Sequence, residues 1–264
     1  MNQTNTGRVL VTIMVMASLA AAGAVGAQTN KGSDDAKASA DAKVVAKAVA
    51  KADASTSATP TASKEEPGPD DPRIKMLAAI LLDDERGVAR LLAEGVDPNI
   101  REQKRGPAIV MAIQEKSFGA AQQLLVSDQV DVDASNARGE TALMLASLMG
   151  NGATVDKLIE KGATVNKDGW SPLHYAASGG HNHIVSKLLA AGADIDALSP
   201  NGTTALMLAA RRGSLTPYQT LLKAGADPRP VNEANLSAAD YLDRIGEADR
   251  ARLLRAYSAG FEPK

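Results

Sequence analysis

Internal repetition is the feature that most limits what this 264-residue chain can fold into. Three eight-residue blocks are alike: GETALMLA at 139–146, GWSPLHYA at 169–176 and GTTALMLA at 202–209. A second block of the form Leu-(Leu/Ile)-X-X-Gly-Ala follows each, and its glycine lies at the same distance after the Thr or Ser of the first block in all three copies. Such a period indicates one supersecondary unit stacked many times, because a single unit cannot bury its own apolar face.

Weaker copies extend the repetition in both directions. Arg105–Met111 resembles Arg138–Met144 one repeat later, and Lys75–Ala79 and Leu236–Asp240 continue the series at the same interval. The folded region is therefore expected to cover 71–264 and to contain six units, with approximate limits 71–104, 105–137, 138–167, 168–200, 201–233 and 234–264.

The first block resembles the T-P-L-H-x-A signature of ankyrin repeats, and Ser171–Ala176 matches it most closely. The resemblance implies an all-α solenoid of about six stacked helix-turn-helix units with short β-turn fingers. It also implies that His174 is structural, with an imidazole that hydrogen-bonds near the helix start and bridges neighbouring repeats. His181 matches a second common ankyrin position, between the two helices of a unit.

The residue types agree with that arrangement on physical grounds. Thr or Ser at the start of the first helix caps exposed N–H groups, and Pro172 suits the first helical turn. Ile184, Val185 and Leu188 recur at helical spacing, so they are expected to bury one face of the second helix. Gly192 is expected to end that helix in the left-handed region.

Two features are expected to differ from a regular repeat: the length of one finger and the outer surfaces of the end units. The interval from Thr141 to Ser171 is shorter than the interval from Ser171 to Thr204, so the finger between units three and four should be short and leave a notch. The outer sides of the first and last units should be polar, because they have no further repeat to pack against.

Residues 1–27 have the layout of a bacterial-type secretory signal peptide. Arg8 precedes an apolar run from Val9 to Ala22, and small residues up to Ala27 offer a cleavage site. We expect export to the periplasm, with secretion as the second choice, and no stable membrane insertion after cleavage. An uncleaved inner-membrane anchor is the alternative, because 9–27 is barely long enough to span a bilayer.

Residues 28–70 are predicted to be a disordered tether. This segment is rich in Ala, Lys, Asp, Ser, Thr and Pro and has no aromatic residue, so it cannot bury enough apolar surface to order itself.

Composition and motifs argue against enzymatic chemistry and against cofactors. Cysteine is absent, which removes thiolate nucleophiles and thiolate zinc sites, and the net charge of −2 offers no broad basic surface for nucleic acid. No P-loop, dinucleotide-binding glycine pattern or G-x-S-x-G elbow is present. Six aspartates fall at the finger position after a repeat's glycine, where they are expected to cap turns: Asp97, Asp131, Asp133, Asp194, Asp196 and Asp227.

A metal- or small-ligand-binding periplasmic protein is the alternative class of function. It would use His181 and His183, which form an H-x-H pair. Residues two apart on a helix do not share a face, and no cysteine or nearby carboxylate completes a ligand set, so we expect no functional metal site.

The predicted function is therefore non-enzymatic binding of another protein by a monomer. Ankyrin arrays usually bind on a concave face made of finger tips and first helices, and mapping those positions here gives the candidate partner-binding residues Trp170, Tyr175, Leu145, Leu148, Met149, Leu208, Arg211, Arg212, Arg138 and Arg105. The only tryptophan falls in this set, and exposed aromatic residues are favoured anchors. The alternative is that Trp170 and the leucines pack between repeats. For the basic fingertips, which include Arg101, Lys104 and Lys167, the alternative is a solvated edge.

Overall fold

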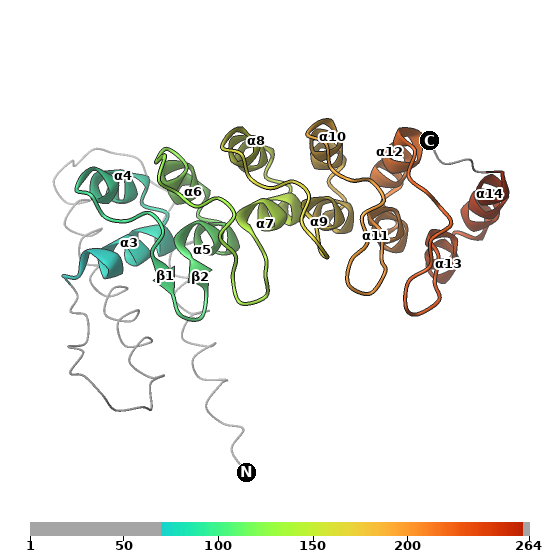
Figure 1. Cartoon of the computed structure of the whole chain (residues 1–264), viewed down its shortest axis with the longest axis horizontal. Helices are drawn as coiled ribbons and strands as arrows, with labels where there is room; N and C mark the ends of the chain where they lie inside the picture. The colour runs from blue at the N-terminus through green and yellow to red at the C-terminus, as the bar shows by residue number, and fades with distance from the viewer. Residues whose placement is uncertain (1–69, 261–264) are drawn as a thin grey trace, which may run out of the picture. The chain divides into compact units, whose positions relative to one another are not determined.

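A computed structural model describes residues 70–260. The predicted signal peptide and the predicted tether up to residue 69 lie outside the described residues. The twelve helices of the described part form six pairs, and Figure 1 shows the first helix of each pair in one row and the second in another. The pairs are α3 (Pro72–Leu81) with α4 (Glu85–Ala93), α5 (Ala108–Gln114) with α6 (Phe118–Leu124), α7 (Ala142–Met149) with α8 (Gly152–Glu160), α9 (Pro172–Gly179) with α10 (Asn182–Ala190), α11 (Ala205–Arg212) with α12 (Leu215–Ala224), and α13 (Ala238–Arg244) with α14 (Ala248–Ala259).

Contacts between helices follow the repeat order. Each first helix packs on the next first helix, as α7 does on α9 and α9 on α11, and second helices such as α10 and α12 pack in the same way. This is the expected all-α solenoid of about six stacked units. The residue limits of the units stay predictions, because a repeat can be divided at any equivalent point of its cycle.

Small side chains allow the first helices to approach one another closely. Ala146, Ala176 and Ala209 are fully buried at equivalent positions. In the second helices the predicted apolar face is buried, as Ile184, Val185 and Leu188 of α10 show. One continuous core therefore runs along the array, and burial against neighbours supplies its stability.

The threonine caps have the predicted geometry at Thr141 and Thr204, whereas the Ser171 hydroxyl lies against His174 Nδ1 instead. The Thr204 hydroxyl accepts a hydrogen bond from the Met207 N–H at 3.3 Å, and this satisfies one of the N–H groups left free at the start of α11. Gly192 has φ of +84°, the left-handed conformation that a side chain would resist, and follows Ala191, the C-cap of α10.

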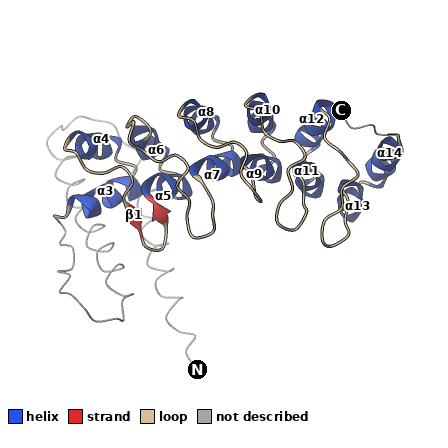
Figure 2. Cartoon of the chain, in the orientation of Figure 1, coloured by secondary structure: helices blue, strands red, loops and turns tan. Residues whose placement is uncertain are grey.

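The loops that join one pair to the next, here called fingers, cover 94–107, 125–141, 161–171, 191–204 and 225–237. They carry little strand: Arg101–Glu102 (β1) pairs antiparallel with Gly106–Pro107 (β2) in the first finger, and Figure 2 shows how small this sheet is beside the helices. The finger 161–171 is shorter than 191–204, as expected, and its loop in Figure 1 reaches less far from the helices.

Four of the six finger aspartates cap turns as predicted, namely Asp97, Asp131, Asp194 and Asp227, whereas Asp133 and Asp196 accept from the next finger. Asp194 accepts from the Asp196 N–H at 3.1 Å within one finger. Asp196 in turn accepts from the Asp227 N–H of the next finger at 2.8 Å. Neighbouring fingers are thus joined by side chain to backbone hydrogen bonds.

The outer side of the last unit is less polar than predicted. Arg255 pairs with Asp240 and Asp243 there, but Leu253 of α14 is 67% exposed and Tyr257 is 48% exposed. The polar residues of α14 therefore share its outer surface with large apolar side chains.

Candidate functional site

A hollow of about 230 Å³ lies where three consecutive first helices meet the short finger. We call it the α9 hollow, because α9 lies between α7 and α11 in the row of first helices (Figure 1). Its lining consists of Leu148 from α7, Trp170 from the finger, His174, Tyr175 and Ser178 from α9, and Leu208 and Arg211 from α11.

Trp170 stands at the rim of this hollow. It follows Gly169, whose φ is +79°, and precedes Ser171, the cap of α9, so the chain turns into the helix at this point. Its ring meets His174 edge to face, with ring centroids 5.5 Å apart. The indole is still 37% exposed, which places a large apolar surface in water.

His174 is fixed by hydrogen bonds on both ring nitrogens. Nε2 lies 2.9 Å from the Thr203 carbonyl oxygen, which can only accept, so Nε2 carries the proton. Nδ1 accepts from the Ser171 N–H at 3.2 Å and lies 2.8 Å from the Ser171 hydroxyl. Burial lowers the pKa of the imidazole, so the ring is neutral. This confirms the expected bridge between a helix start and the next finger.

Tyr175 is held in place by the preceding repeat. Its hydroxyl donates to Glu140 Oε1 at 3.1 Å, and burial followed by the Glu140 charge raises the pKa of this phenol to about 12. Burial also raises the pKa of Glu140, but hydrogen bonds from Asn136, Arg138 and Tyr175 outweigh it and keep that pKa below its usual range. Glu140 is therefore a carboxylate whose charge is already paired.

Arg211 has no carboxylate partner in the described residues, unlike Arg138 and Arg105. Arg138 pairs with Glu140 at 2.8 Å, and Arg105 lies 3.5 Å from Glu115. Arg211 is exposed on α11 and makes no ion pair with any residue between 70 and 260. The rim of the α9 hollow therefore carries one uncompensated positive charge.

The short finger changes how neighbouring fingers meet. Elsewhere a finger glycine lies against the backbone of the next finger, as Gly106 does against Asn136. At the short finger, Lys167 reaches back instead, and its ammonium donates to the Gly139 carbonyl at 3.1 Å. The Lys167 side chain thus joins these two fingers beside the hydrogen bonds of Thr164 with Asp133, where Gly106 and Gly202 meet main chain of the next finger.

The structure separates the predicted partner-binding residues into three groups. Leu145 and Leu208 are only 4% exposed, which corrects the expectation that they belong to an open patch: they pack between first helices, although Leu208 still forms part of the floor of the hollow. Leu148 and Trp170 are each 37% exposed. Met149, Tyr175 and Arg105 are half-buried, and Arg138, Arg211 and Arg212 are exposed.

Two of the other basic finger residues donate hydrogen bonds to carbonyl groups of a neighbouring finger. The Arg101 guanidinium donates to the Ser135 carbonyl of the next finger at 2.9 Å, and Lys167 is engaged as described. Sequence reasoning missed Glu140 as the residue that fixes Tyr175. The signal was present, since the separation of Glu140 and Tyr175 along the chain is close to one repeat period.

His181 and His183 do not form a ready ligand pair. Their ring centroids are 6.2 Å apart, and His181 Nε2 lies 2.9 Å from the Leu148 carbonyl oxygen, so this ring also ties two repeats together. Across the described residues, no three His, Asp or Glu side chains gather as a metal site would need. Within the same range, every helix is too short or too polar to cross a bilayer.

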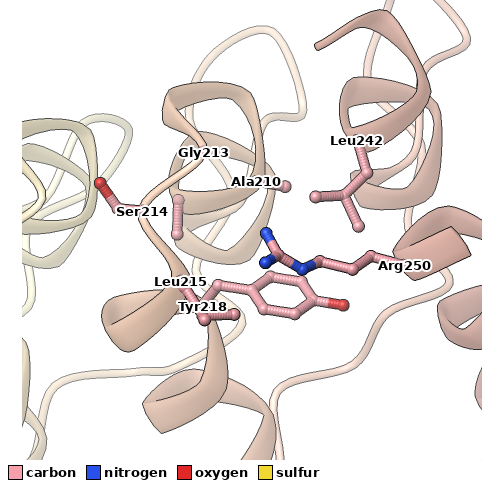
Figure 3. Close-up of a pocket in the computed structure, with 8 residues that line it drawn as sticks. Ala210, Gly213, Ser214, Leu215, Tyr218, Leu242 and Arg250 are labelled. Atoms are coloured by element: carbon pink, nitrogen blue, oxygen red, sulfur yellow. The ribbon is translucent and has the colours of Figure 1, made fainter. Parts of the chain in front are cut away.

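A second depression, between α11 and the last helix pair, is already filled. Figure 3 shows Arg250 of α14 reaching between Tyr218 and Leu242, and Ala210 and Gly213 also line this depression. Its guanidinium pairs with Glu247 at 3.2 Å. This arginine closes the gap between neighbouring repeats and leaves no room for a ligand.

Comparison with known proteins agrees with the architecture. The family described as "Ankyrin repeats (3 copies)" matches residues 75–168 and 155–232, together more than half of the chain. The mouse B-cell lymphoma 3 protein homolog is 34% identical over 147 residues, 53% of this chain and 33% of that protein. The rat ankyrin repeat and SAM domain-containing protein 6 is 37% identical over 117 residues, covering 43% and 13%.

Another matched relative has a different name. The E3 ubiquitin-protein ligase XBAT33 of Arabidopsis thaliana is 46% identical over 72 residues, 27% of this chain and 12% of that protein. The chain thus spans a third or less of the length of these relatives.

Proposed function

The chain belongs to the ankyrin-repeat family, and from that premise we propose that it is a non-enzymatic scaffold, exported from the cytoplasm, that binds a protein partner on the concave face of its array. Ankyrin repeats generally mediate protein–protein interaction. The proposal places the contact on repeats three to five, around the α9 hollow, and treats the scaffold as a monomer.

The observation that carries this proposal is the exposure of Trp170 beside Leu148 at the α9 hollow. Two large apolar side chains that each keep more than a third of their surface in water lose that hydration when a partner covers them. Tryptophan and arginine are enriched among the residues that dominate binding energy, and Trp170 and Arg211 line the same hollow.

Rigidity supports the same function. Trp170 contacts a histidine that is hydrogen-bonded at both nitrogens, and Tyr175 is fixed by Glu140. Side chains that are already ordered lose little conformational entropy on binding. Polar groups of the kind that perform acid–base chemistry, such as His174 and Asp194, are instead used to join repeats and cap turns, which supports a role in binding rather than catalysis.

The test is capture of the partner from the native envelope by the full chain. The double variant Trp170→Ala with Tyr175→Ala should reduce the amount captured while its melting temperature falls by no more than a few degrees. Val126→Ala, an exposed apolar change on another finger, is the control and should leave capture unchanged. Unfolding of the double variant would show that both aromatic residues belong to the core, and unchanged capture would place the contact elsewhere.

Export is proposed from residues 1–27, with the periplasm as the destination. Mass spectrometry of the mature N-terminus tests it: a chain that starts at Gln28 supports cleavage and export. An intact N-terminus found in the membrane fraction supports the inner-membrane anchor instead, and recovery from the medium supports secretion.

A further inference from the structure

We propose that the α9 hollow receives one large apolar side chain from an extended segment of the partner, and that Arg211 binds a carboxylate one or two residues away in that segment. This rests on the proposed function, because it specifies the chemistry of the partner that the same surface would recognise.

The size of the hollow suits a single side chain. Sites for small organic ligands usually enclose about 300–1,000 Å³. The α9 hollow measures about 230 Å³ and is bounded mainly by Leu148, Trp170, Tyr175 and Leu208. A leucine or phenylalanine of a partner would fit in this space and cover the exposed indole, which removes apolar surface from water on both sides.

The positive charge of Arg211 at the hollow favours an acidic residue next to the apolar residue of the partner segment. His174 is neutral because it is buried, and the Glu140 carboxylate is paired with Arg138 at 2.8 Å. Arg211 is therefore the one lining residue whose charge is uncompensated within residues 70–260. A guanidinium presents a planar set of donors that matches a carboxylate in a bidentate pair, so an Asp or Glu is the complementary residue.

The next repeat gives the bound segment a direction. Arg244 of α13 stands at the position equivalent to Arg211, one repeat later, and it too is exposed and without an ion pair in the described part. Positive charge thus continues from α11 towards α13, whereas the apolar lining lies over α9. The partner segment should run with its apolar residue at α9 and its acidic residues towards α13.

The test uses the full chain and a phage-displayed library of random twelve-residue peptides. The enriched sequences should share a large apolar residue with Asp or Glu one or two positions away. The chain contains a single tryptophan, so titration of a synthetic enriched peptide can be followed by Trp170 fluorescence, which reports on the hollow itself.

Charge reversal separates Arg211 from general attraction. Arg211→Glu should weaken the enriched peptide at least about tenfold, as expected for a hydrogen bond to a charged group. A peptide with Lys in place of its acid should regain binding to that variant. Arg212→Glu changes the adjacent residue by the same charge outside the lining of the hollow, and it should have a much smaller effect.

Three results would overturn the inference: no enriched peptide, enriched peptides without an acidic residue, or equal losses for the Arg211 and Arg212 variants. The proposed function fails differently. If peptides that shift Trp170 fluorescence bind without a preference for an acidic residue, the carboxylate specificity of Arg211 is refuted. Protein binding at the α9 hollow is then still supported. If enriched peptides bind without any change at Trp170, binding at this surface falls as well.

Discussion

Replacement of His174 by alanine should destabilise the protein, because this imidazole joins two neighbouring repeats. His174 is 1% exposed, and its two nitrogens reach Ser171 at the start of α9 and the Thr203 carbonyl of the following finger. The substitution removes the hydrogen bonds on both nitrogens, including the contact of Nδ1 with the Ser171 hydroxyl at 2.8 Å, and leaves the alanine methyl group in a space shaped for a ring.

The expected loss of unfolding free energy depends on which hydrogen bonds Thr203 and Ser171 keep after the substitution. The Thr203 carbonyl still accepts from the Ser199 N–H at 3.0 Å, so only the value of one hydrogen bond, about 1 kcal/mol, is lost there. The Ser171 N–H is buried and has no other acceptor in the described residues, so it bears the larger penalty of about 1–3 kcal/mol. Together the free energy of unfolding at pH 7.5 should fall by about 3 kcal/mol.

The loss should also depend on pH. Burial lowers the pKa of His174 in the folded state below its ordinary value of 6.5, so the unfolded chain binds a proton first as the pH falls. The stability that the neutral imidazole contributes is complete above pH 6.5 and declines as the pH falls towards the folded-state pKa, by no more than about 1.4 kcal/mol per pH unit. The gap between wild type and His174→Ala should therefore be smaller at pH 5.5 than at pH 7.5.

Urea unfolding followed by circular dichroism measures this at both pH values. His183→Ala is the matched control, because this histidine is exposed on α10, and its loss should be within about 0.5 kcal/mol at pH 7.5. Equal losses for the two variants, or a gap that widens as the pH falls, would refute the assignment of His174 as a buried neutral bridge.

Three further outcomes follow from the same structure. Leu158→Ala in α8 removes a fully buried side chain between repeats and should lower the free energy of unfolding by about 2–5 kcal/mol in a urea titration. Thr204→Ala removes the cap on the Met207 N–H and should cost about 1 kcal/mol, whereas Thr204→Ser should retain most of it. Asp240→Ala should lower the urea midpoint at pH 7, because hydrogen bonds from Ser237 and then the Arg255 charge hold the pKa of Asp240 at about 2, below 3.8. That contribution is complete above about pH 4 and is lost as the pH falls towards 2, so an acid titration in which the difference from wild type does not shrink would contradict it.

Local sequence was sufficient to predict the repeat itself. The caps at Thr141 and Thr204, the left-handed glycine at 192 and the buried stripe of α10 depend on neighbours within a few residues, so their spacing along the chain reveals them. The short finger could be read in the same way, because a missing segment changes the interval between two recognisable blocks. The inter-repeat role of His174 came from the family resemblance, and the structure confirms it.

The exposure of single side chains could not be read from the repeat pattern. Leu145 and Leu148 lie on one face of α7, less than one helical turn apart, and both suited an exposed patch, yet Leu145 is covered and Leu148 is not. How deeply α9 covers each position decides between them, and that depends on the offset between two helices that the periodicity leaves undetermined. The polar character predicted for α14 failed at Leu253 and Tyr257 for a related reason, since composition does not tell which face of a terminal helix remains uncovered.

The helix pairs, their caps, their number and the place of the short finger were predictable from the amino-acid sequence alone, because these arise from contacts at fixed separations along the chain. The packing of the repeats in three dimensions brings Leu148, Trp170 and Arg211, from three different repeats, into the wall of one hollow. It also pairs the Glu140 carboxylate with Arg138, whereas Arg211 has no ion pair within residues 70–260. Those relations depend on where separate helices stand in space, and a repeat pattern records only how each helix is built.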